Sequence, residues 1–441
     1  MKVHFIGIGG IGISALARYY LLKGHKITGS DLVSSEITDY FKKKGVKVFI
    51  GKHKANNISK DTDLVIYSPA VILNNSERKK ALKLGIRIRT YPEALGELTR
   101  THFTIAVAGS HGKSTVAAMI GTLLAKAGLD PMVIVGTKLK EFNDSNLRMG
   151  CQKSKVKNQK SLLVIEADEY FASFLNYWPK IIVLPALEAD HLDFYKTLDN
   201  LFITFKRFIA HLPNEGILIA NKDDKNIKKI LKKSPYNIIY YSLKDKEAER
   251  LKKILKVPGD FNILNALAAL KTAQVLKVPN KTSFKSLSQY KGSWRRFDIT
   301  EVLSPKPYTL IDDYGHHPTQ VRVTLKATRE KFPKKEIWCV YQPHQYQRTN
   351  SLFNEFVKAF KKAPVNKLII TDIYSVAGRE KNEIKKKVSS QKLVKAVNKS
   401  FVTYLPKSKI ESFLKKNIKG GEVVIIMGAG DIYDLSLRLK S

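Results

Sequence analysis

The sequence predicts an α/β protein of three consecutive Rossmann-like α/β domains with mostly parallel sheets, the central one carrying a P-loop. Apolar strand-like runs alternate with helix-like segments along the chain, a pattern typical of parallel sheets. Three of these runs end in a glycine-rich turn, within residues 2–22, 103–125 and 422–432. With 441 residues the chain is long enough for several domains. We expect them at residues 1–98, 99–293 and 294–441.

The first glycine turn follows an apolar strand at residues 2–6 and contains Gly7, Gly9, Gly10 and Gly12. Glycines at these positions let a diphosphate approach the N-terminus of the next helix. Asp31 follows the next predicted strand, where it could contact a ribose or a base. Ser68, Pro69 and Ala70 end a third strand at the same sheet edge. A nicotinamide-dependent dehydrogenase would show much the same turn, so this feature alone leaves the ligand open.

The second glycine turn, within residues 103–115, predicts a phosphate-binding loop. Gly109 and Gly112 bring backbone N–H groups close to phosphate oxygens, Lys113 can reach the β and γ phosphates, and the Ser114 hydroxyl can ligate Mg²⁺. The usual pattern would place its first glycine at position 107, which is Val107 here. We therefore expect a shortened loop, with a helix starting at Lys113.

Two acidic clusters follow apolar strands in the central segment, at residues 166–169 and 188–191. Carboxylates at the ends of parallel strands, in a domain with a phosphate loop, suit Mg²⁺ held against a triphosphate. We expect Glu166 and His191 to be ligands. Hydrogen bonding or helix capping explains Asp168, Asp190 and Asp193 equally well.

Composition narrows the function classes. Lys and Arg total 77 against 39 for Asp and Glu, a formal net charge of +38, but the lysines are spread over helical patterns and no zinc or RNA-binding motif accompanies them. A specific nucleic-acid partner is therefore not expected. The two cysteines, Cys151 and Cys339, form no disulfide or metal pattern, and no apolar run reaches membrane length, so we expect a cytoplasmic protein without membrane insertion.

The motifs, in this order and over nearly the whole chain, resemble the Mur ligase family of cell-wall precursor synthesis. The resemblance rests on six motifs, at residues 7–12, 109–115, 166–169, 188–191, 295–297 and 312–318. It implies that the first domain binds the UDP part of a substrate, the central domain binds MgATP, and the third closes on both and helps to hold an amino acid.

The reaction implied by the resemblance is ATP-dependent amide formation between the lactyl carboxylate of UDP-N-acetylmuramate and L-alanine, through an acyl phosphate. The implied cofactors are ATP and Mg²⁺, and the implied partners are these small molecules. A monomer and a homodimer both stay open. A second Mg²⁺ would lie at His191, nearer the acyl phosphate.

The resemblance also assigns site residues. Nucleotide contacts fall on Gly109, Ser110, His111, Gly112, Lys113, Ser114, Thr115, Asn262, Asn265, Arg296 and Asp313. Contacts with the other substrates fall on Gly9, Gly10, Ile11, Gly12, Asp31, Ser68, Tyr314, His316, His344 and Arg348. The metal ligands would be Ser114, Glu166 and His191, and the catalytic residues Lys113, His191, Asp313, His316 and Arg348, with His316 as the candidate to take the amine proton.

Three positions bear on which nucleotide and which amino acid a member of this family would use. Gln345 stands where alanine-adding members usually carry arginine, and Phe261 stands where the adenine-binding run usually has histidine. Lys206 lies near the place of a carbamylated lysine in sister ligases, and we expect it to be an ordinary solvated lysine. A sister ligase that adds a recycled peptide or another amino acid is the main alternative. A dehydrogenase, a nucleic-acid-dependent ATPase and an inactive relative are weaker ones.

Overall fold

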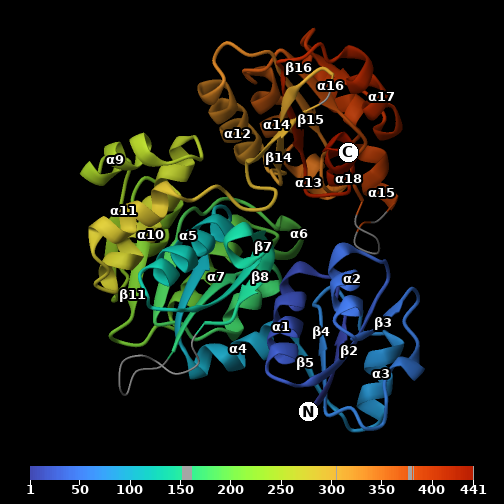
Figure 1. Ribbon diagram of the computed structural model, residues 1–441, viewed down its shortest axis with the longest axis vertical. Helices are drawn as coiled ribbons and strands as arrows, with labels where there is room; N and C mark the ends of the chain where they lie inside the picture. Colours follow the sequence, from blue (N-terminus) through green and yellow to red (C-terminus); the bar gives the residue numbers. More distant parts are fainter. Residues whose placement is uncertain (151–160, 304, 376–379, 381, 441) are drawn as a thin grey trace. The chain divides into compact units, whose positions relative to one another are not determined.

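The computed structural model describes residues 1–150, 161–303, 305–375, 380 and 382–440 (Figure 1). These residues form two compact units. The first unit contains Met1–Ala189, Thr197–Asp245 and Leu264–Leu287, and the second contains Asp190–Lys196, Lys246–Ile263 and Ser288–Ser441. Cys151 falls within residues 151–160, which lie outside the described residues.

The N-terminal sheet of the first unit has five parallel strands in the order β3-β2-β1-β4-β5. The strands are β1 (Lys2–Ile6), β2 (Lys26–Asp31), β3 (Lys47–Ile50), β4 (Leu64–Tyr67) and β5 (Arg87–Thr90). The helices are α1 (Ile11–Leu22), α2 (Glu36–Lys43), α3 (Ser76–Lys83) and α4 (Tyr91–Thr101), with a 3-10 turn η1 (Ala55–Asn57).

Alternation along β1 divides the core of this sheet between two faces, as expected for a strand that is covered on both sides. Val3 and Phe5 pack with Leu16 of α1 and Phe41 of α2, whereas Ile6 packs in a separate cluster that includes α3. Because β1 lies between β2 and β4, the glycine turn after β1 is at the switch point of the sheet, where open α/β sheets bind ligands.

The second sheet of the first unit has seven strands in the order β12-β11-β10-β6-β9-β7-β8, of which only the β7–β8 pair is antiparallel. The strands are β6 (Phe103–Ala108), β7 (Met132–Leu139), β8 (Ser145–Arg148), β9 (Leu162–Ala167), β10 (Ile181–Leu184), β11 (Ile217–Asn221) and β12 (Asn237–Tyr241). The helical segments in residues 113–288 are α5 (Lys113–Lys126), η2 (Lys140–Phe142), η3 (Tyr170–Asn176), α6 (Leu192–Tyr195), α7 (Leu198–Ile209), α8 (Lys225–Leu231), α9 (Lys246–Ile254), α10 (Asp260–Val275) and α11 (Asn280–Ser288).

The third sheet, in the second unit, has six strands in the order β13-β14-β18-β15-β16-β17, and its edge strand β13 is antiparallel to β14. The strands are β13 (Asp298–Val302), β14 (Tyr308–Asp313), β15 (Ile337–Tyr341), β16 (Lys367–Ile370), β17 (Val402–Tyr404) and β18 (Val423–Met427). The helices are α12 (Pro318–Lys331), α13 (Tyr346–Ser351), α14 (Phe353–Lys361), α15 (Asn382–Lys387), α16 (Ser390–Val397), α17 (Lys407–Asn417) and α18 (Tyr433–Lys440).

Helices cover both faces of this third sheet. Cys339 on β15 packs with Val321 of α12 and Phe356 of α14, and the adjacent Val340 packs on the other face with Ile410 of α17. The sequence prediction of three mostly parallel α/β sheets is thus confirmed. Among the described helices, none combines the length and the apolar character needed to cross a membrane.

Candidate functional site

The glycine turn after β1 is held by the end of β2. The N–H groups of Gly7 and Ile8 donate to the carbonyl of Ser30, at 2.8 and 3.1 Å, and the N–H of Gly9 donates to Oδ2 of Asp31 at 2.8 Å. A methyl group on Gly9 would lie 2.8 Å from the same Oδ2, so a side chain at this position would displace the carboxylate that accepts the Gly9 N–H. Asp31 therefore shapes the turn, and its predicted contact with a ribose or a base stays a prediction.

The helix that follows this turn begins without a side-chain cap. Gly10 is the N-cap residue of α1 and offers no side-chain acceptor to the first backbone N–H groups. A helix N-terminus of this kind favours an anion, because its N–H groups and its dipole both attract negative charge. Ser68 lies on the other side of the turn, with its Cβ 3.2 Å from where a Cβ of Gly7 would be. The predicted substrate residues of the first domain therefore meet at one sheet edge.

The phosphate loop has the backbone conformation that requires glycine. Gly109 and Gly112 have φ angles of 147° and 82°. A Cβ on Gly109 would lie 2.6 Å from the carbonyl oxygen of Ala186, and one on Gly112 would lie 2.7 Å from Oδ1 of Asn265. The loop is shortened as expected, since Val107 is a buried residue of β6. The structure also places Asn265 beside the loop.

Lys113, the first residue of α5, reaches back across the loop. Its Nζ donates to the carbonyl of Gly109 at 2.8 Å and to Oε2 of Glu169 at 2.6 Å, and lies 3.8 Å from Oδ1 of Asp168. Burial by itself would lower the pKa of Lys113, but the two carboxylates outweigh it and raise the pKa above its usual value. The ammonium is therefore charged and available to phosphate oxygens.

Ser114 and Glu166 form the oxygen pair expected for a divalent cation. The Ser114 hydroxyl donates to Oε1 of Glu166 at 3.0 Å, and the other carboxylate oxygen accepts from the N–H of Gly136 on β7 at 2.7 Å. A carboxylate oriented by a backbone N–H and a hydroxyl beside it are hard oxygen donors of the kind that Mg²⁺ prefers. The residues present therefore fit the predicted ion.

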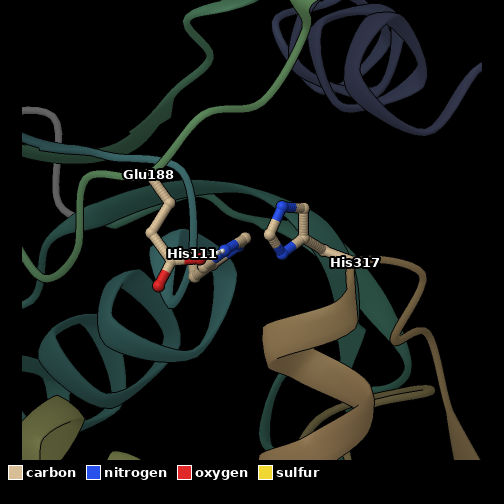
Figure 2. Close-up of side chains that lie close together, drawn as sticks. All are labelled: His111, Glu188 and His317. Carbon is tan, nitrogen blue, oxygen red and sulfur yellow. Dashed lines mark hydrogen bonds and ion pairs between the residues drawn. The ribbon is translucent and has the colours of Figure 1, made fainter. Parts of the chain in front are cut away.

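Ser110 and His111 tie the loop to the segment that follows β10. The Ser110 hydroxyl donates to the carbonyl of Glu188 at 2.8 Å and accepts from its N–H at 3.0 Å. Figure 2 shows the imidazole of His111 beside the carboxylate of Glu188, with Nε2 3.2 Å from Oε2. These contacts fix the course of the loop, while direct contacts of Ser110, His111 and Thr115 with a nucleotide remain predictions.

In the second unit, Arg348 on α13 forms a buried ion pair with Asp190. Its Nη2 and Nε lie 2.9 and 3.3 Å from Oδ1 of Asp190, and its Nη1 lies 3.3 Å from Nδ1 of His344. Burial would raise the pKa of Asp190, but the charge of Arg348 outweighs it and holds that pKa well below the usual range. His191 belongs to the same unit and donates its N–H to Oδ1 of Asp190 at 2.8 Å.

His316 lies beside this pair as a neutral imidazole. Burial, followed by the charge of Arg348, lowers its pKa well below the usual value. Its Nδ1 lies 3.0 Å from the carbonyl oxygen of Tyr314, and because a carbonyl only accepts, Nδ1 carries the proton. The ring also packs near Tyr314 and His344, with centroids 5.5 and 5.7 Å away. The second unit thus brings together Tyr314, His316, His344 and Arg348, as the sequence predicted.

The carboxylate of Asp313 is bound by backbone N–H groups of two nearby turns. Its carboxylate accepts from the N–H of Phe297 at 2.9 Å and from that of Gly315 at 2.8 Å, and burial raises its pKa. Arg296 stacks on Tyr314, with Cζ 4.8 Å from the ring centre. This geometry indicates that Asp313 positions the turns that carry Arg296 and Tyr314, and nucleotide contacts of Asp313, Arg296 and Asn262 remain predictions.

The three positions that bear on the nucleotide or on the branch of the family have defined environments. Phe261 packs against the hydrophobic core of the third sheet, Lys206 is exposed on α7, and Gln345 is a buried N-cap residue of α13 with φ 72°. The environment of Lys206 agrees with a solvated lysine.

Sequence reasoning assigned no role to Glu169, Glu188 or Tyr91. Glu169 and Glu188 could have been identified, because each stands in an acidic cluster at the end of a strand. Tyr91 carries no comparable signal, since only the fold brings it beside the glycine turn.

Comparison with known proteins gives three matches in order along the chain. The Mur ligase family, catalytic domain, matches residues 2–103; the Mur ligase middle domain matches residues 107–273; and the Mur ligase, glutamate ligase domain, matches residues 295–430.

Individual proteins agree with this. A UDP-N-acetylmuramate--L-alanine ligase of Acetivibrio thermocellus is 39% identical over 458 residues, which covers 98% of this chain and 94% of that protein. The crystal structure of the UDP-N-acetylmuramate-alanine ligase of Thermotoga maritima superposes with a TM-score of 0.81 at 25% identity, covering 100% of this chain and 98% of that one. A murein peptide ligase of Psychrobacter arcticus shares the fold, with a TM-score of 0.74 at 22% identity and coverage of 100% and 98%.

Proposed function

Because the chain belongs to the Mur ligase family, we propose that it is an ATP-dependent ligase that joins L-alanine to the lactyl carboxylate of UDP-N-acetylmuramate, in the synthesis of peptidoglycan precursors. Relatives that carry this activity in their names match over nearly the full length of the chain. The observation that carries the proposal is the presence, in one compact unit, of a glycine turn fitted to a diphosphate and a phosphate loop with Lys113, Ser114 and Glu166.

The first step that these residues serve is activation of the carboxylate. A carboxylate is a poor electrophile toward an amine, so the γ-phosphoryl group of ATP is transferred to it and ADP leaves. Lys113 donates to the phosphate oxygens on which charge accumulates, and the loop N–H groups orient them. Ser114 and Glu166 would hold Mg²⁺, which would neutralise negative charge on the phosphates.

The second step is attack of the amine on the acyl phosphate, with loss of inorganic phosphate. Arg348, fixed by Asp190 and His344, is oriented to bind the carboxylate of the amino acid or an oxygen of the acyl phosphate. His316 presents an unprotonated Nε2, which suits the removal of a proton from the attacking ammonium. In this scheme His191 remains the candidate ligand of a second Mg²⁺.

The setting follows from the reactants. ATP and a uridine sugar nucleotide are small cytoplasmic metabolites, so we place the enzyme in the cytoplasm. The excess of positive charge in the chain, +38, favours capture of such anions at low ionic strength.

The test is ADP release by the purified protein with MgATP and UDP-N-acetylmuramate, against L-alanine, glycine, L-serine and the recycled tripeptide. We expect turnover that requires both the sugar nucleotide and L-alanine. Turnover with the tripeptide alone would move the chain to the peptide-adding branch. ATP hydrolysis that does not depend on the sugar nucleotide would refute the proposal.

A further inference from the structure

Tyr91 occupies a fixed position at the start of α4. The N-cap residue of this helix is Thr90, whose hydroxyl accepts from the N–H of Glu93 at 3.3 Å, while the Glu93 carboxylate accepts from the N–H of Thr90 at 2.7 Å. Pro92 follows with its restricted φ angle. This reciprocal capping fixes the first turn of the helix and therefore the direction of the Tyr91 side chain.

On one side, the ring of Tyr91 lies against the first turn of α1. A methyl group built on Gly12 would lie 3.2 Å from Cε1, 3.3 Å from Cζ and 3.4 Å from Oη of Tyr91. A side chain at position 12 would therefore press on the ring, which lies in close contact with this turn. The phenol thus borders the helix N-terminus at which the diphosphate of a sugar nucleotide is expected to bind.

The carboxylates of the central domain also act electrostatically on Tyr91. Burial, followed by the negative charges of Glu166 and Asp168, raises the pKa of Tyr91. The hydroxyl therefore keeps its proton at neutral pH and can donate it to an oxygen of a ligand. Glu166 is one of the two residues fitted to Mg²⁺. Tyr91 therefore contacts the glycine turn and lies within electrostatic range of the predicted metal site.

The hydroxyl of Tyr91 is also an available donor. Several other tyrosine hydroxyls are used within the protein: that of Tyr341 donates to the carbonyl of His316, and that of Tyr67 accepts from Arg78. For Tyr91, no hydrogen bond to the hydroxyl exists within residues 1–150 and the other described parts of the chain. A partly buried ring with a protonated hydroxyl and no internal acceptor suits a ligand oxygen.

We propose that Tyr91 is a substrate-binding residue that donates a hydrogen bond to an oxygen of the N-acetylmuramoyl group, where this group runs from the glycine turn to the phosphate loop. The assignment rests on the proposed function. A substrate that is anchored by its diphosphate at α1 and reacts at its carboxylate beside Lys113 must extend away from the first turn of α1, and the ring of Tyr91 lies in contact with this turn. Tyr91 would then distinguish UDP-N-acetylmuramate from UDP.

The test is the affinity of the Tyr91→Phe variant for UDP and for UDP-N-acetylmuramate, measured by calorimetry. Phenylalanine keeps the ring against Gly12 and removes only the hydroxyl. We expect the Kd for UDP-N-acetylmuramate to rise about 2- to 13-fold, as for loss of one hydrogen bond, with the Kd for UDP and for MgATP unchanged. Unchanged MgATP binding also shows that the variant is folded.

Tyr20→Phe is the matched control. Tyr20 lies at the other end of α1, where its ring packs edge-on against Phe5, with the ring centroids 5.9 Å apart. Removal of the Tyr20 hydroxyl should leave the affinities for UDP and UDP-N-acetylmuramate as in the wild type. Equal weakening of UDP and UDP-N-acetylmuramate by Tyr91→Phe, or no weakening of either, would overturn the assignment. Wild-type protein that does not bind UDP-N-acetylmuramate would overturn the proposed function and this assignment with it.

Discussion

The ammonium of Lys113 lies 2.6 Å from the fully buried carboxylate of Glu169, across the phosphate loop. The pair joins the start of α5 to the segment after β9, so the lysine predicted to contact the triphosphate is held in place before any nucleotide binds. Phosphate oxygens would then share this ammonium with Glu169. The positive charge of Lys113, held by Glu169, therefore organises the loop, and the negative phosphates of the nucleotide are expected to complement it.

Replacing Glu169 by glutamine should destabilise the nucleotide-free protein by about 3 kcal/mol, because it leaves a buried ammonium without its main counter-charge. MgATP should then stabilise the variant more than the wild type, since the phosphates supply the missing negative charge. Urea unfolding with and without MgATP measures both effects. Glu215→Gln, which removes an exposed partner of Lys180, is the control and should change neither value. Equal stabilisation of variant and wild type by MgATP would contradict the prediction.

Replacing Lys113 by alanine should abolish ADP release and leave the binding of UDP-N-acetylmuramate intact. In the proposed function the lysine supplies positive charge to the phosphates, whereas the sugar nucleotide is expected to bind at the glycine turn of the N-terminal sheet. Calorimetry with the sugar nucleotide separates the two effects. Lys206→Ala serves as the control, because Lys206 is exposed on α7 and its removal should leave turnover unchanged. Loss of both ADP release and binding of UDP-N-acetylmuramate in Lys113→Ala would mean that ATP and the sugar nucleotide are assigned to the wrong sites.

Asp190→Asn should cost about 3 kcal/mol of stability, because Arg348 would keep its charge in a buried place without compensation. The double variant Asp190→Asn/Arg348→Gln should be less destabilised than the sum of the two single changes. A double-mutant cycle from urea unfolding measures this coupling. Additive effects would show that the 2.9 Å contact contributes no coupling energy.

The buried neutral His316 predicts a pH effect on stability. Its folded-state pKa lies well below the usual value of about 6.5, so its contribution is complete above pH 6.5. Below this pH the imidazole of His316 takes up a proton in the unfolded chain but stays neutral in the folded protein. The free energy of unfolding therefore falls by up to about 1.4 kcal/mol per pH unit. His316→Asn, whose amide can still donate to the Tyr314 carbonyl, should lose less stability between pH 7.5 and pH 5.5. Urea unfolding at both pH values is the measurement. Equal losses of stability in the wild type and in His316→Asn would contradict the prediction.

Gln345→Arg should lower the KM for L-alanine if the site is short of one contact to the amino-acid carboxylate. A charged hydrogen bond contributes roughly 1.5 to 3 kcal/mol, so the effect should be at least about tenfold. Steady-state kinetics with L-alanine at saturating MgATP and sugar nucleotide measure it, with the KM for ATP as the internal control. An unchanged KM for L-alanine would show that another residue, with Arg348 the nearest candidate, already binds the carboxylate.

The elements that the sequence predicted well are those encoded over short distances. The strand at Phe103–Ala108, the two glycines and the helix starting at Lys113 follow one another directly, and the structure has them in that order. The approach of Ser114 to Glu166 was predicted because parallel strands end at one sheet edge, which brings distant residues together by a general rule. The predicted roles at Asp31 and Asp313 were less complete. Both carboxylates accept backbone N–H groups of nearby turns, and the sequence gives no means to count such bonds.

The sequence by itself determined the class of fold, the order of the sheets and the position of the phosphate loop, because glycine spacing and apolar runs act through local backbone geometry. Only the tertiary structure decided which charges meet. The pairs Lys113–Glu169 and Arg348–Asp190 join residues far apart in the chain, and burial together with these partners sets the pKa of each group. The same holds for Tyr91, which packs on Gly12 only because α4 returns to the start of α1. Such contacts depend on how helices pack on a sheet, and no local pattern in the sequence determines which distant residues come together.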